Sequence, residues 1–308
     1  MKAAVIDMGT NTFHLIIAEI SPAGVEVIYK TNVPVRLGEG RINENLIIPE
    51  AFERGINTLK DFKEEINKQQ VSLVRAIATS AVRSAINGHD FVAAAHDAGI
   101  EIEVISGEEE AAYIFNGVKA TGIIAATSLI MDIGGGSTEF IICNTEGQLW
   151  KKSYNIGAAR LMQAYFRSDP INEEDRSAII NRLDTELADL KTACQKFNPK
   201  ILIGSAGAFE TFAAMLLTDT DVKNISSAAL DLEAYSMLSK KLIASSHAER
   251  VNMPNLISLR VDMIVIAAII TNYVIKNLDL TAINLSTYDL KMGVLFTIRE
   301  DQKFDNAV

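Results

Sequence analysis

Three consecutive glycines stand between two acidic residues in the segment 131–140, MDIGGGSTEF. Asp132 precedes the glycines, Ser137 and Thr138 follow them, and Glu139 comes next. Successive backbone N–H groups in a glycine turn can form a nest that binds an anion, and neighbouring hydroxyl groups add donors. A carboxylate at the end of a strand can hold a cation directly or through water. The segment therefore predicts a loop that binds phosphate beside a metal ion.

The spacing of these glycines excludes two common phosphate motifs. A P-loop has Gly-Lys-Ser/Thr leading into a helix, whereas no lysine follows here and the next residues, EFIIC, resemble a strand. The dinucleotide fingerprint requires G-x-G-x-x-G at the start of a helix, which this segment lacks. Two interpretations remain: an anion-binding turn between two strands, or a tight hairpin whose acids are solvated.

A second copy of the pattern, DMGTNTF at 7–13, favours the anion-binding interpretation. Each copy follows an apolar run that ends in Asp-x-Gly, and Asp7 is the acid of the first copy. The first copy supplies four candidate phosphate ligands, Gly9, Thr10, Asn11 and Thr12. Paired loops in two related halves are typical of the actin and sugar-kinase type of fold, in which two hairpins grip a phosphate chain across a cleft. This inference is an analogy of fold and does not define the reaction.

The segments around the loops alternate between strand and helix patterns, which predicts an α/β protein with mixed sheets. Strands are expected before and after each loop, and helices over 107–118 and over 256–278. The length of 308 residues fits two domains. We expect two related actin-like (ribonuclease H-like) domains, 1–120 and 121–308, flanking a cleft, with the final helix packing back on the first domain.

Three glutamates, Glu108, Glu109 and Glu110, begin the predicted helix over 107–118. Because the helix macrodipole favours negative charge at this end, stabilisation of the helix start is one interpretation. Ile114 and Val118 mark the buried face, and Glu110 lies one turn before Ile114, so Glu110 leans toward that face. An inward carboxylate near bound phosphate is suited to accept a proton from an attacking water molecule, which makes Glu110 the candidate catalytic base.

The composition excludes several classes of partner and compartment. A net charge of −10 disfavours a nucleic-acid binder, since no surplus of Lys and Arg exists to neutralise a phosphate backbone. The most apolar run, which starts at Met263, is shorter than the ~20 residues of a membrane span. Cys143 and Cys194 lie far apart and argue against a disulfide scaffold or a thiolate metal site. We expect no membrane association and a cytoplasmic location.

Taken together, the motifs resemble those of the exopolyphosphatase and guanosine pentaphosphate phosphohydrolase family, in its short two-domain form. The matching segments are IDMGTNTFHLIIAEI, ATSAVRSAIN, ISGEEEA, MDIGGGSTEF, NIGAARL and LRVDMIV. The resemblance implies hydrolysis of a terminal phosphate of inorganic polyphosphate, or of the 5′ γ-phosphate of guanosine pentaphosphate, assisted by magnesium. It also implies a possible homodimer.

Carried over by motif position, the resemblance implies a role for each candidate residue. Glu110 is the base that activates water, and Arg83 offers a bidentate cation to phosphate. Asp132 and Glu139 are the acids of the metal site, with Gly134 nearby. The phosphate ligands of the two loops are Gly9, Thr10, Asn11, Thr12, Gly135, Gly136, Ser137 and Thr138. Weaker candidates are Asp7, His14, Gly204, Ser205 and Gly207.

Several positions depart from the family pattern. His14 stands where the family commonly has Arg, so that phosphate contact is expected to be weaker or pH-dependent. The segment GSAGAFET at 204–211 is poorer in Gly-Thr than usual. Asp289, Lys291 and Met292 stand where Gly, Arg and Glu are usual. These departures bear on the substrate more than on the fold.

Two other functions remain open from the sequence. An ATP-dependent kinase of the same fold would transfer phosphate to a small acceptor instead of water, and it would require an adenosine pocket in the second half. A sensor would bind polyphosphate or a guanosine alarmone without turnover.

Overall fold

The computed structural model describes residues 1–302, which fold into two compact units. The first unit contains residues 1–120 and the chain from Leu290 onward, and the second contains residues 121–289. Each unit is built on one mixed β-sheet and is described by itself.

The sheet of the first unit has the order β3-β2-β1-β4-β5. β1 pairs antiparallel with β2, β2 pairs antiparallel with β3, and β1, β4 and β5 run parallel. The strand bounds are β1 Lys2–Met8, β2 Phe13–Ser21, β3 Gly24–Val33, β4 Leu73–Ala78 and β5 Ile102–Val104.

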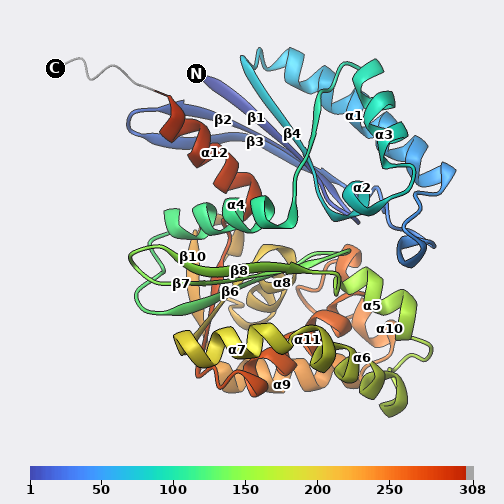
Figure 1. Cartoon of the computed structure of the whole chain (residues 1–308), viewed down its shortest axis with the longest axis vertical. Helices are drawn as coiled ribbons and strands as arrows, with labels where there is room; N and C mark the ends of the chain where they lie inside the picture. The colour runs from blue at the N-terminus through green and yellow to red at the C-terminus, as the bar shows by residue number, and fades with distance from the viewer. Residues whose placement is uncertain (303–308) are drawn as a thin grey trace. The chain divides into compact units, whose positions relative to one another are not determined.

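Helices cover both faces of this sheet (Figure 1). On one face, Ala4, Ile6 and Met8 of β1 form a core with residues of α1 and α3. Because side chains alternate along a strand, Asp7 lies on the opposite face, where α12 packs across β1, β2 and β3. The helix bounds are α1 Pro49–Lys68, α2 Ser80–Ser84, α3 Gly88–Asp97, α4 Gly107–Ala120 and α12 Leu290–Asp301. A 3-10 turn, η1, covers Ile42–Glu44.

Helices α4 and α12 pack closely against each other. A Cβ atom on Gly293 of α12 would overlap the backbone carbonyl of Tyr113 in α4. The Asn116 side-chain amide also donates to Oγ1 of Thr297 at 3.2 Å. Glycine at 293 therefore permits the backbone approach that fixes α12 on the helix that carries Glu110.

The sheet of the second unit has the order β10-β11-β9-β6-β7-β8. Strands β6, β7 and β8 form an antiparallel meander, and β6, β9 and β11 run parallel, as β1, β4 and β5 do in the first unit. The strand bounds are β6 Ser128–Ile133, β7 Thr138–Cys143, β8 Gln148–Tyr154, β9 Ile201–Ser205, β10 Ser227–Leu230 and β11 Ala282–Ser286. The predicted α/β fold with two related actin-like sheets is confirmed, and the cleft between them stays a prediction.

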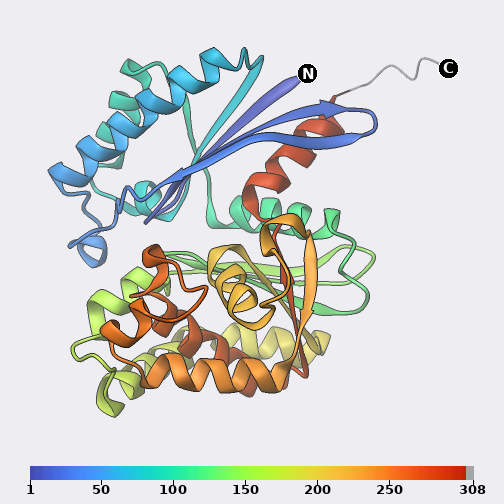
Figure 2. The same ribbon diagram turned by 180° about the vertical axis from the view of Figure 1, so that it is seen from behind.

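One continuous apolar core joins this sheet to its helices, several of which form the layer seen in Figures 1 and 2. The helix bounds are α5 Ala158–Tyr165, α6 Glu173–Glu186, α7 Ala188–Phe197, α8 Ala206–Leu216, α9 Leu232–Ala244, α10 His247–Val251 and α11 Ile264–Asn277. Short 3-10 turns, η2 and η3, cover Val222–Asn224 and Ser258–Arg260. Within residues 1–302, no helix combines the length and apolarity that crossing a bilayer requires.

The predicted helix over 256–278 is wrong in its first part, because α11 begins only at Ile264. In a continuous helix the Val261 carbonyl would accept from the amide four residues later, whereas here it accepts from Nε of Arg250 at 2.8 Å. Arg250 is almost fully buried, and it also donates to the Ser245 carbonyl and to Asp169. The segment before α11 therefore follows its own path, with Arg260 at the end of a 3-10 turn.

Candidate active site

The first predicted phosphate loop, Gly9–Thr12, is held by the chain that follows β3. The Thr10 carbonyl accepts from the Gly38 amide at 3.0 Å, and the Asn11 carbonyl accepts from the Arg36 amide at 2.8 Å. In a trans peptide, the carbonyl and the next N–H point in opposite directions. The amides of Asn11 and Thr12 therefore point away from the 36–38 segment.

The second loop is held in the same way by the start of α5. The Gly134 carbonyl accepts from Ala158, the Gly135 carbonyl from Ala159 and the Gly136 carbonyl from Gly157, at 2.8, 2.9 and 3.4 Å. The amides that follow these carbonyls, those of Gly135, Gly136 and Ser137, therefore point away from α5. Three amides turned to one side are the arrangement that an anion-binding nest requires, and the binding of phosphate here stays a prediction.

The two loops are structural copies of each other. A Cβ atom on either Gly9 or Gly134 would lie 3.0 Å from the carbonyl oxygen three residues later. After each meander the chain makes the same i to i−2 bond, Val35 to Val33 and Ile156 to Tyr154. Sequence reasoning found both loops but missed the two segments that hold them, because backbone hydrogen bonds over this separation leave no residue pattern.

The glutamates at the start of α4 divide into two roles. Glu109 forms a reciprocal cap with Ser106: its carboxylate accepts from the Ser106 amide at 2.8 Å, and its own amide donates to the Ser106 hydroxyl. Glu110 is 8% exposed, and its Oε2 accepts from Nη1 of Arg83 at 2.9 Å. Stabilisation of the helix start thus explains Glu109, whereas Glu110 does not form this cap and is buried against Arg83.

Arg83 lies in α2 and uses Nη1 for two acceptors. It donates to the Ile105 carbonyl at 3.0 Å as well as to Glu110. This arrangement fixes the Glu110 carboxylate. The Arg83 side chain is 24% exposed, and the rest of its guanidinium fork can bind a further anion. The sequence predicts Arg83 as a phosphate ligand, and the structure adds its contact with the candidate base.

The predicted metal acids lie opposite each other on β6 and β7. Asp132 and Glu139 are paired residues of the antiparallel ladder, and both are buried. Such partners project from the same face, and like charges placed there repel each other. The Glu139 carboxylate also accepts from the Ser153 hydroxyl at 2.6 Å. A magnesium ion fits this set, since it is typically bound by one or two carboxylates together with substrate phosphates.

The metal role of Gly134, the other predicted member of the site, stays a prediction. The Gly134 carbonyl, the one oxygen it could offer to a metal, accepts from the Ala158 amide. In this structure Gly134 forms the turn and holds α5. Across residues 1–302 there is no cluster of three or more His, Cys, Asp or Glu residues arranged for a metal, so a metal here would depend on Asp132, Glu139 and the substrate.

Arg260 lies within the electrostatic range of Asp132, a relation that sequence reasoning missed. Its guanidinium packs on Gly207, where a Cβ atom would overlap it. Burial lowers the pKa of Arg260, while the charges of Glu210 and Asp132 raise it. The LRVDMIV motif contains this arginine, but the distance along the chain from Asp132 gave no signal of their proximity.

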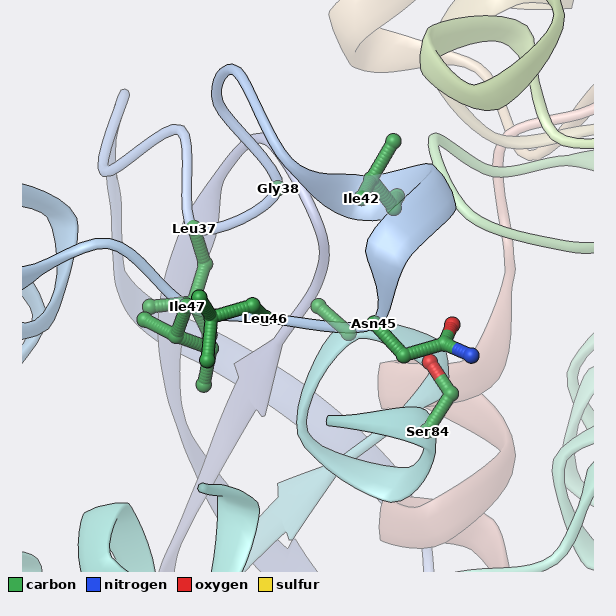
Figure 3. Close-up of a pocket in the computed structure, with 8 residues that line it drawn as sticks. Leu37, Gly38, Ile42, Asn45, Leu46, Ile47 and Ser84 are labelled. Carbon is green, nitrogen blue, oxygen red and sulfur yellow. The ribbon is translucent and has the colours of Figure 1, made fainter. Parts of the chain in front are cut away.

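A small pocket of the first unit (Figure 3) is lined in part by Gly38, whose amide donates to the Thr10 carbonyl of the first loop. The side chains of Asn45 and Ser84 lie next to each other on one side of it. The remaining lining residues are Leu37, Gly38, Ile42, Leu46, Ile47 and Ala81. The predicted phosphate and acid residues do not line this pocket.

Residues 16–301 match the Ppx/GppA phosphatase family. The chain belongs to this family. A crystal structure of an exopolyphosphatase from Cytophaga hutchinsonii is 38% identical, with a TM-score of 0.94 over 98% of this chain and 99% of that one. A Haemophilus influenzae protein, provisionally named as an exopolyphosphatase, is 29% identical over 97% of this chain and 92% of its own length.

A third relative is named for the other activity of the family, the GppA-type hydrolysis of a guanosine phosphate. The guanosine-5′-triphosphate,3′-diphosphate pyrophosphatase of Pseudoalteromonas translucida is 30% identical over 96% of this chain, which spans 59% of that relative's length. All of these names describe phosphoanhydride hydrolases. The prediction that the chain is such an enzyme is confirmed.

The departures from the Ppx/GppA pattern have structural counterparts. His14 of β2 is the ladder partner of Asp7 in β1, so both residues lie at the same end of the sheet. Gly204 accommodates the ring of Phe209, which a Cβ atom would overlap. Ser205 is fully buried and is the ladder partner of Asp132. Gly204 thus has a packing role, whereas Ser205 lies beside Asp132, one of the two predicted metal-site acids.

Ala206, in the GSAGAFET segment at 204–211 of this Ppx/GppA chain, has a left-handed backbone with φ of 63°. A left-handed conformation costs a residue with a Cβ atom about 1 kcal/mol or more. We therefore expect Ala206→Gly to raise the midpoint of thermal unfolding by about 2–4 °C. Ala214→Gly, later in α8, serves as the control and should lower it. An unchanged or lower midpoint for Ala206→Gly would contradict the assignment of strain.

Proposed function

We propose that the chain is an exopolyphosphatase, which hydrolyses the terminal phosphoanhydride bond of inorganic polyphosphate and releases orthophosphate. The observation that carries the proposal is the duplicated loop, since each copy turns successive amides to one side. Two anion-binding loops suit a substrate made of linked phosphates. The Cytophaga relative, named as an exopolyphosphatase and matched over nearly its whole length, supports the choice of polyphosphate.

In the proposed mechanism, the amides and hydroxyl groups of the two loops bind phosphate oxygens. The Glu110 carboxylate, oriented by Arg83, accepts a proton from a water molecule as the water oxygen attacks the terminal phosphorus. The bond from that phosphorus to the bridging oxygen breaks, and the shortened chain leaves with the bridging oxygen. When bound near Asp132 and Glu139, magnesium would offset the negative charge of the phosphates. That one phosphate chain spans both loops stays a prediction from the sequence.

Guanosine pentaphosphate is the second candidate substrate, and the Pseudoalteromonas relative favours it. The reaction at its 5′ γ-phosphate would use the same groups. The departures at Asp289, Lys291 and Met292 do not discriminate between the two substrates. Magnesium as cofactor, a homodimer and a cytoplasmic location likewise stay proposals.

Time-resolved release of orthophosphate tests the function directly. We expect the chain to release phosphate from short and long polyphosphate in the presence of magnesium, and to lose this activity when a chelator removes the metal. The same assay with guanosine pentaphosphate measures the second activity. Binding of polyphosphate without any release would overturn the proposal in favour of a sensor. Phosphorylation of an added acceptor by ATP would indicate a kinase.

A further inference from the structure

Lys291 occupies an unusual position for a cation. It is the second residue of α12, where the helix macrodipole favours anions and disfavours positive charge. Its side chain is only 16% exposed. A partly buried ammonium group at this end of a helix requires a compensating negative charge.

Asp7 provides that charge. Nζ of Lys291 lies 3.7 Å from Oδ2 of Asp7, whose side chain is 15% exposed. This separation exceeds the 2.7–3.2 Å of an N–H···O hydrogen bond, so this contact is an ion pair held by charge alone. The lysine stem has four rotatable carbons and a compact charge, which lets the ammonium move to a nearby anion without displacing the helix.

The helix itself is firmly placed. Gly293, two residues after Lys291, meets the Tyr113 backbone of α4, and Thr297 accepts from Asn116 one turn later. The base of the lysine side chain is therefore fixed relative to the helix that bears Glu110. A preorganised cation loses little freedom when it binds a ligand.

Asp7 also places the ammonium at the start of the first phosphate loop. Only Met8 separates Asp7 from Gly9, and the loop amides of Asn11 and Thr12 are the ones turned away from the 36–38 segment. We propose that Lys291 is a substrate-binding residue whose ammonium contacts a phosphate oxygen, and that Asp7 holds this ammonium until the phosphate arrives. The inference rests on the proposed function, because it assigns a phosphate ligand to the same site.

Binding of inorganic tripolyphosphate by isothermal titration calorimetry, in metal-free buffer, tests the assignment without any turnover. Lys291→Gln removes one charge-assisted contact, so we expect this variant to bind tripolyphosphate about 10- to 100-fold more weakly than the unchanged chain. Lys291→Arg, which keeps the charge, should bind within about threefold of the unchanged chain. The control is Lys119→Gln, at an exposed position at the end of α4, and its affinity should not change.

A double variant separates phosphate binding from simple neutralisation of Asp7. If Lys291 contacts phosphate, Asp7→Asn combined with Lys291→Gln stays weak, because no cation replaces the lost ammonium. Restored affinity in the double variant, or unchanged affinity in Lys291→Gln alone, would overturn the proposal. Thermal unfolding of each variant checks the fold, and Lys291→Arg tests the charge if Lys291→Gln does not fold. Absence of polyphosphate hydrolysis would overturn the proposed function and leave this binding result intact.

Discussion

Glu110→Gln is expected to lower the rate of orthophosphate release from polyphosphate by about 10²- to 10⁴-fold, the usual contribution of a general base. Glutamine has nearly the same shape, and its side-chain oxygen can still accept from Arg83, but it cannot take a proton from water at neutral pH. The substitution should leave the fold and tripolyphosphate binding largely intact. Single-turnover phosphate release measures the loss in the chemical step.

The neighbouring residue offers a matched control. Glu109→Gln removes the same charge one position earlier, and glutamine can replace glutamate at this position of the cap with Ser106. Its rate should stay close to that of the unchanged chain. Equal rates for the two variants, or full activity in Glu110→Gln, would show that the base lies elsewhere.

Gly157→Ala is expected to reduce both stability and activity. A Cβ atom at this position would overlap the backbone of Gly135, which cannot move without turning the amides of the second loop. Overpacking of this kind typically costs about 1–3 kcal/mol. The midpoint of thermal unfolding should fall, and phosphate release should fall further than the loss of folded protein explains. Thermal unfolding and steady-state kinetics on the same preparation separate the two effects.

Ala158→Gly is the control for this experiment. It removes a side chain from the first residue of α5 instead of adding one, and it keeps the amide that binds the Gly134 carbonyl. It should cost about 1 kcal/mol through helix propensity, and about 1 kcal/mol more because the Ala158 methyl group is buried, while leaving the loop and the activity in place. Full activity in Gly157→Ala would refute the idea that α5 holds the loop amides in their binding orientation.

Local patterns predicted the features that depend on neighbours in the chain. Asp132 and Glu139 flank one turn, so their spacing alone placed them on adjacent strands. The inward direction of Glu110 followed from the helical period, which the burial of Ile114 and Val118 confirms. Short apolar runs likewise predicted most strands of the two sheets, but β10, Ser227–Leu230, was not predicted.

Contacts between distant segments were beyond such patterns. Arg83 and Glu110 are 27 residues apart, and Arg260 lies in the part of the predicted 256–278 helix that the structure replaces with a 3-10 turn and a separate path. That departure depends on Arg250, whose burial and hydrogen bonds come from tertiary packing. A sequence identifies an arginine as a charged donor, but it does not identify the carbonyl or carboxylate that accepts its hydrogen bonds in the folded protein.

Because α12 belongs to the first unit, the order of translation determines when this unit can complete its fold. Residues 1–120 leave the ribosome first, yet the helix that packs across β1, β2 and β3 follows 169 residues of the second unit. Until translation reaches α12, this face of the nascent sheet lacks that cover, and Asp7 lacks its lysine. The first unit therefore completes its fold only after the second unit has been translated, which makes the packing partner of α4, the helix that carries Glu110, available later than α4 itself.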